Sequence, residues 1–155
     1  MNMTRNLKIL IIEDDSHKID DLSRFISELG DQYSYLIKKS VREAVMEVIN
    51  NDHDIIILDM ALPTFNQADK ASGGISQPQG GLEIIRTLKS IKKNMDVIIF
   101  TQYPDIEIDG KFQSINNSVD ILSKRYKCNI IGAIHYKYDD LIWKKKLRET
   151  LGVHQ

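Results

Sequence analysis

The sequence predicts an α/β fold in which helices cover both faces of a parallel sheet. Three short apolar runs support this fold, at residues 7–12, 54–58 and 97–100. Continuous runs rich in β-branched residues are typical of strands buried on both faces of a parallel sheet. Helix-like segments separate these runs, and strands that alternate with helices predict βαβ units with right-handed crossovers.

The remaining elements follow from the same patterns. Apolar residues recur at a helical spacing in residues 18–29, and Gly30 ends this helix. Ser40 is a candidate N-cap, with Glu43 as its capping-box partner. The expected strands cover residues 7–12, 33–38, 54–58, 97–100 and 129–135, and the expected helices cover residues 18–29, 40–49, 81–91, 114–126 and 139–151.

Length and composition favour one soluble domain spanning residues 1–155. The net charge of −1 gives no support for a nucleic-acid binder or for a protein that binds anionic membranes. Cys128 is the single cysteine, so no intrachain disulfide can form and a reducing cytoplasm is the natural location. No apolar run approaches the ~20 residues of a membrane span, and the N-terminus does not resemble a signal peptide.

One stretch departs from the alternation of strands and helices. Residues 64–80 are rich in Gly, Ser, Gln, Ala and Asn and contain few residues with large apolar side chains. This composition predicts an exposed loop, and loops of this length inside compact domains tend to be functional or disordered. We do not expect a linker between two domains here, because neither flank is long enough to form a domain alone.

Acidic residues follow two of the predicted strands directly. Glu13 and Asp14 come after the first strand, and Asp59 comes after the third. Ligands of open parallel sheets bind beyond the carboxyl ends of the strands, so three carboxylates converge there if these strands are neighbours. Two unit charges ~4 Å apart repel by ~4 kcal/mol at an effective dielectric constant near 20, so the cluster needs a cation or a bound proton. Oxygen ligands favour Mg²⁺ over zinc.

Two further residues are expected at the same edge of the sheet. Thr101 follows the fourth strand, and Lys137 follows the fifth. A hydroxyl group and an ammonium group supply the hydrogen-bond donor and the counter-charge that a bound phosphoryl group needs. Each residue alone would indicate only a turn or a solvated surface, and it is their joint placement that points to phosphoryl chemistry.

Together these residues resemble the response-regulator receiver family of two-component signalling, in its stand-alone single-domain form. The resemblance covers nearly the whole chain in the family's order and includes Pro63, four residues after Asp59. It implies a doubly wound five-stranded parallel sheet of flavodoxin-like strand order 2-1-3-4-5. The stretches that carry it are residues 8–15, 54–63, 81–86, 97–101 and 131–137.

The resemblance also implies a role for each site residue. Mg²⁺ would be bound by Glu13, Asp14, Asp59 and the backbone carbonyl of Ala61. Asp59 would accept the phosphoryl group from a histidine kinase or phosphotransfer protein, with Lys137 as its counter-charge and Thr101 as the switch residue. The protein would catalyse its own phosphotransfer without being a conventional turnover enzyme. As a monomer or weak dimer, it would signal through an unidentified downstream protein or a phosphate relay, because residues 152–155 leave no room for a DNA-binding domain.

The sequence departs from the family pattern in several places. Tyr138 stands where the family has a proline, and cis peptides are largely confined to proline. The stretch 64–80 replaces a much shorter loop beside Asp59, and the stretch 101–137 is longer than usual, which predicts a remodelled fourth helix or entry to it. Ile134 occupies the position of the family's switch aromatic residue.

Two other interpretations fit parts of the pattern. The chain could be a receiver-like binding module with an altered or lost switch, although Asp59, Thr101 and Lys137 are all present. It could also be an enzyme on a similar sheet, such as a haloacid-dehalogenase-like phosphatase or a topoisomerase-primase-like domain. Those families have a second aspartate two residues after the first, and here that position is Ala61.

Overall fold

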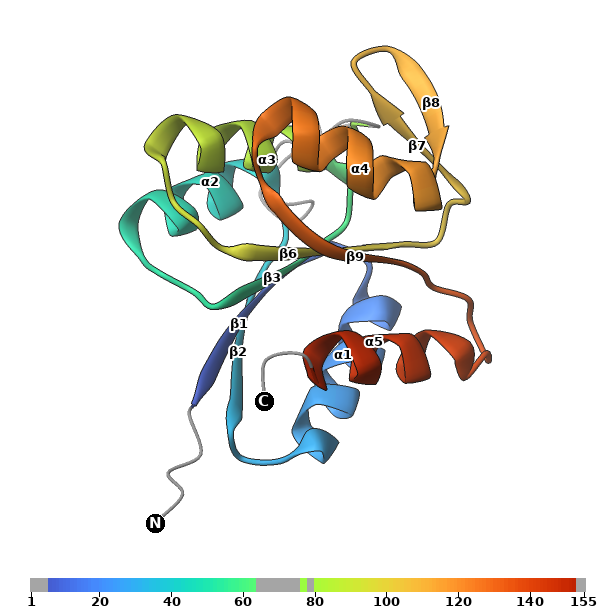
Figure 1. The fold of residues 1–155 in the computed structure, drawn as a ribbon. Helices are drawn as coiled ribbons and strands as arrows, with labels where there is room; N and C mark the ends of the chain where they lie inside the picture. Colours follow the sequence, from blue (N-terminus) through green and yellow to red (C-terminus); the bar gives the residue numbers. More distant parts are fainter. Residues whose placement is uncertain (1–5, 64–75, 78–79, 153–155) are drawn as a thin grey trace, which may run out of the picture.

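Five parallel strands form the central sheet of the protein, in the order β2-β1-β3-β6-β9 (Figure 1). The structure is a computed structural model that describes residues 6–63, 76–77 and 80–152. The five strands of this sheet, counted along the chain, lie in the predicted order 2-1-3-4-5, which is confirmed. The strands are β1 (Leu7–Ile12), β2 (Tyr33–Lys38), β3 (Ile55–Leu58), β6 (Asp96–Thr101) and β9 (Asn129–His135).

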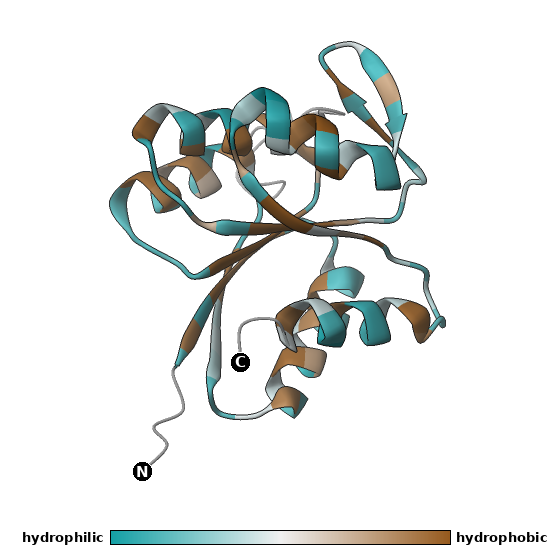
Figure 2. Cartoon of the chain, viewed as in Figure 1, coloured by the Kyte–Doolittle hydropathy of each residue, from teal (hydrophilic) through white to brown (hydrophobic). Residues whose placement is uncertain are grey.

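Helices cover both faces of this sheet, as predicted (Figure 1). One face carries α1 (Ser16–Leu29) and α5 (Ile142–Gly152). The other carries α2 (Val41–Asn50), α3 (Gly80–Ile91) and α4 (Ile115–Tyr126). Figure 2 shows hydrophobic strands between the two helical layers, with hydrophilic residues on the outer faces of the helices.

The alternation of side chains along each strand divides the core into two layers. In β1, Ile9 and Ile11 pack toward α1 and α5, whereas Leu10 and Ile12 pack toward α2, α3 and α4. All four are fully buried, as expected for a strand covered on both faces. This double burial explains why the strand sequences are apolar runs rather than alternating patterns.

The local signals in the sequence match the structure closely. The Ser40 hydroxyl accepts a hydrogen bond from the Glu43 backbone amide at 3.2 Å and caps α2 as predicted. The five predicted helices are all present, and α5 begins at Ile142 rather than at residue 139. Within the described residues, no helix is long and apolar enough to cross a membrane.

The stretch predicted as an insertion beside Asp59 is flanked by a short antiparallel pair of strands. Strand β4 (Leu62–Pro63) pairs with β5 (Ser76–Gln77), and α3 begins at Gly80. The loop predicted for residues 64–80 otherwise lies outside the described residues.

The remodelling predicted before the fourth helix is a β-hairpin. Strands β7 (Asp105–Ile108) and β8 (Lys111–Ser114) are antiparallel and lie beside α4 (Figure 1). Both turn residues have positive φ, 51° at Asp109 and 84° at Gly110, which is the signature of a type I′ turn. The Asp-Gly pair, preceded by the alternating residues Ile106 and Ile108, could have revealed this hairpin in the sequence.

The tip of the hairpin is bound to the neighbouring helices by a charged cluster that we call the hairpin anchor. The Asp109 carboxylate accepts hydrogen bonds from Arg86 at 2.8 Å, Arg125 at 2.7 Å and the Tyr126 hydroxyl at 2.8 Å. Arg86 lies in α3, and the other two donors lie in α4. The hairpin is therefore held against two helices.

The edge strand β9 contains an irregularity that the sequence did not reveal. Val97 pairs with Ile130, but the next residue, Ile98, pairs with Gly132, so Ile131 is an extra residue in β9. One extra residue turns the side chains that follow to the opposite faces. The described residues contain no cis peptide, and the bond between Lys137 and Tyr138 is trans.

Candidate functional site

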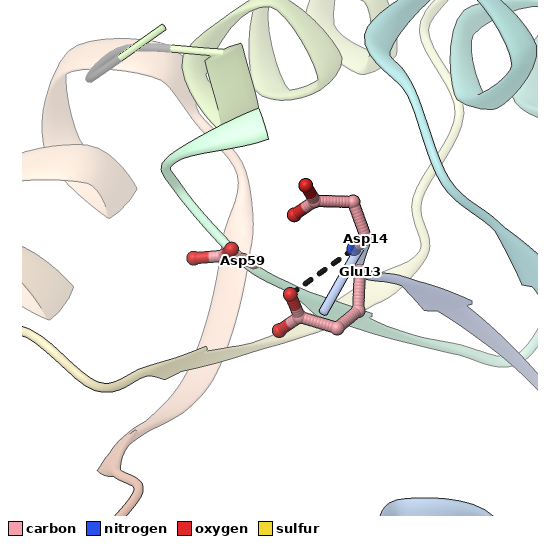
Figure 3. Close-up of side chains that lie close together, drawn as sticks. All are labelled: Glu13, Asp14 and Asp59. Atoms are coloured by element: carbon pink, nitrogen blue, oxygen red, sulfur yellow. Dashed lines mark hydrogen bonds between the residues drawn. The ribbon is translucent and has the colours of Figure 1, made fainter. Parts of the chain in front are cut away.

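Three of the predicted site residues meet at the carboxyl ends of β1 and β3. Glu13 and Asp14 follow β1, Asp59 follows β3, and each offers a carboxylate oxygen within 4.8 Å of the others. Figure 3 shows the three side chains entering one space from these two neighbouring strands. We call this cluster the acid pocket. It arises because β1 and β3 are paired in parallel, so that both chains leave the sheet at the same edge.

Glu13 is the most constrained member of the acid pocket. It is 2% exposed, and its Oε2 atom accepts hydrogen bonds from the backbone amides of Asp14 at 3.1 Å and Asp15 at 3.2 Å. Burial raises the pKa of Glu13 to about 8, the charge of Asp59 adds to this effect, and Lys18 opposes it.

The two carboxylate oxygens of Asp59 have different neighbours. Oδ1 accepts a hydrogen bond from the Ala61 amide at 3.2 Å, and Oδ2 lies 3.6 Å from the ammonium nitrogen of Lys18. The side chain is nearly inaccessible, and burial raises its pKa above the ordinary value. Burial also raises the pKa of Asp14, which is less enclosed.

Lys18 is a residue of the acid pocket that the sequence did not lead us to expect. It lies in the first turn of α1 and is completely buried, with its ammonium nitrogen 2.5 Å from Glu13 Oε1. The same ammonium group donates a hydrogen bond to Gln102 Oε1 at 2.6 Å. One signal was available, because Lys18 stands four residues before Leu22 and so on the helix's apolar, inward-facing stripe.

Thr101 lies at the end of β6 and is almost fully buried. Its hydroxyl oxygen accepts a hydrogen bond from the Tyr103 amide at 3.1 Å. Thr101 also lines a groove of about 400 Å³ together with Met60, Ala61 and residues 103–107 and Phe112. The groove runs from the chain beside Asp59 to the β7–β8 hairpin.

Lys137 does not join the acid pocket. Its side chain is exposed, and within the described part of the chain it forms no ion pair shorter than 4.0 Å with any of the three acids. The extra residue in β9 gives a physical reason, because it offsets the faces of the residues that follow it. Tyr136 is buried instead, and its hydroxyl donates to Asp21 in α1 at 2.6 Å.

The donor set of the acid pocket fits a hard divalent cation such as Mg²⁺. All of its side-chain ligands are carboxylate oxygens, and two of the three residues are nearly inaccessible to bulk water. Three carboxylates face the single ammonium group of Lys18, so negative charge is left in excess in a region of low dielectric constant. Such an excess favours a second cation.

Comparison with known proteins supports the same family. No protein-family model matches the sequence. The Detocs response regulatory protein DtcB of Vibrio alginolyticus is 31% identical over 147 residues, which is 92% of this chain and 98% of that protein. An uncharacterized protein of Sinorhizobium fredii, y4jR, is 22% identical over 93% of this chain and 96% of its own length.

Solved structures show the same fold. The CheY-like response regulator receiver domain protein of Methanospirillum hungatei has a TM-score of 0.63 at 18% identity, with 96% of this chain and 92% of that chain covered. The response regulator TrrA of Thermotoga maritima, in complex with Mg²⁺-BeF, has a TM-score of 0.60 at 20% identity, covering 93% and 98%. Since the identity to DtcB extends over almost both full lengths, the chain belongs to the response-regulator receiver family of two-component signalling proteins.

Proposed function

We propose that this protein is a phosphoacceptor receiver that is phosphorylated on Asp59 by a histidine kinase or a phosphotransfer protein. The observation that carries the proposal is the placement of Asp59, whose buried carboxylate lies beside two further acids and one ammonium group. Positioning and charge neutralisation account for most of the catalysis of phosphoryl transfer, and these residues supply both.

Mg²⁺ would be bound by Glu13, Asp14, Asp59 and the backbone carbonyl of Ala61. When bound, the ion would neutralise charge on the phosphoryl oxygens. The similar regulator TrrA, which was solved in complex with Mg²⁺-BeF, supports this assignment.

The protein's own residues orient the reaction. The Ala61 amide holds Asp59 Oδ1, which fixes the rotation of the carboxylate. An oxygen of Asp59 then attacks the phosphorus atom of the phosphohistidine. The new P–O bond forms as the P–N bond breaks, and the bonding electron pair stays on that imidazole nitrogen. A proton on the other ring nitrogen of the phosphohistidine lets the ring leave as neutral imidazole. The product at Asp59 is an acyl phosphate.

Thr101 is proposed to respond to the new group, since its buried hydroxyl lies at the end of the strand next to Asp59. An added charge of about −1.5 to −2 biases the equilibrium between two surface conformations. The output would pass to a downstream protein by contact, or the phosphoryl group would be passed on, in the cytoplasm and with the chain as one receiver domain.

The test is phosphorylation by a small-molecule donor. Purified protein with MgCl₂ and acetyl phosphate should gain the mass of one phosphoryl group, and Asp59→Asn should gain none. Omission of MgCl₂ should suppress the gain in the wild type. An unchanged mass in the wild type, or an equal gain in Asp59→Asn, would refute the proposal and favour a binding module without the switch.

A further inference from the structure

We propose that Lys18, at the start of α1, supplies the positive charge that holds the phosphoryl group on Asp59, in place of Lys137 at the end of β9. The inference deepens the proposed function and rests on it. It assigns the counter-charge to a helix that follows β1 rather than to the fifth strand of the sheet.

The position of the ammonium group is the first argument. Lys18 Nζ lies 3.6 Å from Asp59 Oδ2, while the side chain of Lys137 is exposed. A lysine has a flexible four-carbon stem and three donors, so a group 3.6 Å from the carboxylate oxygen is within reach of the oxygens of a phosphoryl group bonded to it. Lys137 is exposed and follows β9, which is separated from β3 by β6.

The surroundings of Lys18 are the second argument. Its ammonium group forms an ion pair with Glu13 and donates a hydrogen bond to Gln102, and these two residues follow β1 and β6 respectively. These partners hold the ammonium group between the strand ends that flank Asp59. The aromatic ring of Phe100 lies under it, 5.8 Å from the nitrogen to the ring centroid. The same ammonium group forms an ion pair with Asp59 on the remaining side of the pocket.

The cost of this arrangement is the third argument. A fully buried ammonium group loses its hydration and is tolerated only when it is paired. A methionine or leucine would fill the same inward-facing position of α1 without that cost. The acid pocket provides the compensation, and the ammonium group in turn reduces the repulsion between Glu13 and Asp59 that would oppose an incoming anionic phosphoryl group.

The chemical step is the transfer already described, with Lys18 as a catalytic residue. As the P–O bond to Asp59 forms and the leaving group departs with its bonding pair, negative charge stays on the phosphoryl oxygens. The Lys18 ammonium group donates a hydrogen bond to one of these oxygens and keeps its own proton, so that no proton is transferred.

The first experiment compares two matched variants, Lys18→Met and Lys137→Met, each of which removes one charge and keeps most of the side-chain volume. The initial rate of acetyl-phosphate phosphorylation is followed by intact mass. We expect Lys18→Met to slow the reaction about 100-fold, as is typical when one electrostatic donor is removed. Lys137→Met should remain within about twofold of the wild type, and Lys18→Arg should recover part of the rate because it restores the charge.

The second experiment uses the wild-type protein alone, so that a folding defect in Lys18→Met cannot obscure the result. Lysine labelled with ¹³C at Cε is incorporated, and the two signals are assigned with the Lys18→Arg and Lys137→Arg variants. Spectra with MgCl₂ alone are compared with spectra after addition of beryllofluoride. The Lys18 signal should shift on addition of beryllofluoride, and the Lys137 signal should not.

The outcomes separate the two proposals. A wild-type protein that is not phosphorylated refutes the proposed function itself. A phosphorylated wild type in which Lys137→Met is slow and Lys18→Met is normal, or in which beryllofluoride shifts the Lys137 signal only, overturns the assignment to Lys18 and leaves the receiver function standing.

Discussion

The acid pocket and the hairpin anchor are both built from carboxylates and cations, yet their electrostatics are opposite. Burial raises the pKa of Glu13 in the acid pocket to about 8. Hydrogen bonds from Tyr126 and Arg125 lower the pKa of Asp109 in the hairpin anchor, where the carboxylate is about one-third exposed. The first cluster has three acids and one cation, whereas the second has one central acid and two arginines.

The difference separates a buried cluster with an excess of acids from a more exposed structural contact. An excess of buried negative charge reduces the stability of the fold. Proteins retain such an excess at sites that bind a cation, or an anion together with its counter-ion. A largely exposed cluster of opposite charges costs little and contributes little. The exposed cluster holds the hairpin against α3 and α4, and the buried cluster is the site that we propose for phosphoryl transfer.

The largest effect is expected where α3 approaches the acid pocket. A Cβ atom at Gly81 would lie 2.7 Å from both the Asp59 carbonyl oxygen and the Met60 Cα atom, and backbone atoms cannot yield as a flexible side chain can. Gly81→Ala should reduce the free energy of unfolding by about 3 kcal/mol, measured by urea denaturation. It should also slow phosphorylation by acetyl phosphate.

The hairpin offers the matched control for this prediction. A Cβ atom at Gly110 would meet nothing within 4 Å, so Gly110→Ala carries only the strain of its positive φ of 84°. Its cost should be about 1 kcal/mol, with normal phosphorylation. Equal costs for the two variants would contradict the view that the acid pocket is the more tightly constrained region.

A smaller effect is expected from the charge of Glu13 in Mg²⁺-free buffer. Its pKa rises from 4.5 to about 8 on folding. The stability that this group contributes is therefore fully present below its unfolded pKa and is lost as the pH rises through its folded pKa. Glu13→Gln keeps a side chain of similar size and removes the titration. Relative to this variant, the wild type should lose stability between about pH 5 and pH 8.5, since its folded state holds this proton more tightly than its unfolded state.

Urea denaturation of both proteins at the two pH values measures this difference. Addition of MgCl₂ should reduce it, because a bound cation favours the charged carboxylate. A difference that does not change with pH would show that Glu13 stays in one protonation state, and the electrostatic contrast with Asp109 would then fail.

The smallest effect is expected at the hairpin anchor. Asp109→Ala removes the acceptor of two arginines and Tyr126, but exposed ion pairs contribute only about 0.2–1 kcal/mol each. We expect a loss of at most ~1 kcal/mol, faster amide hydrogen exchange in β7 and β8, and an unchanged rate of Asp59 phosphorylation. A strongly reduced phosphorylation rate would instead couple the hairpin to the acid pocket.

Much of the architecture was predictable from local patterns. Three apolar runs predicted β1, β3 and β6, and the remaining strands and the five helices of this sheet were also expected from the sequence. Glu13, Asp14 and Asp59 could be brought together from the sequence because each follows a strand directly. The β7–β8 hairpin was missed although its Asp-Gly turn carries a recognisable signal.

The partner of Asp59 could not be predicted in this way. Position along the chain favoured Lys137, since it follows the fifth strand. In the structure the Lys18 ammonium group lies beside Glu13 and Asp59 instead. An extra residue in β9 shifts the register of the strand before Lys137. A bulge in an edge strand leaves no clear mark in the sequence, because either register satisfies the same apolar pattern.

The sequence by itself determined the strand and helix pattern and the edge of the sheet at which acids gather. These features depend on side-chain periodicity and on the residues that end each strand, which are properties of short segments. Only the tertiary structure decided which cation enters the acid pocket. Burial of the Lys18 ammonium group depends on Glu13, Asp59 and Gln102 arriving together from the ends of three strands. Compensation of a buried charge is a property of that convergence and of no single segment.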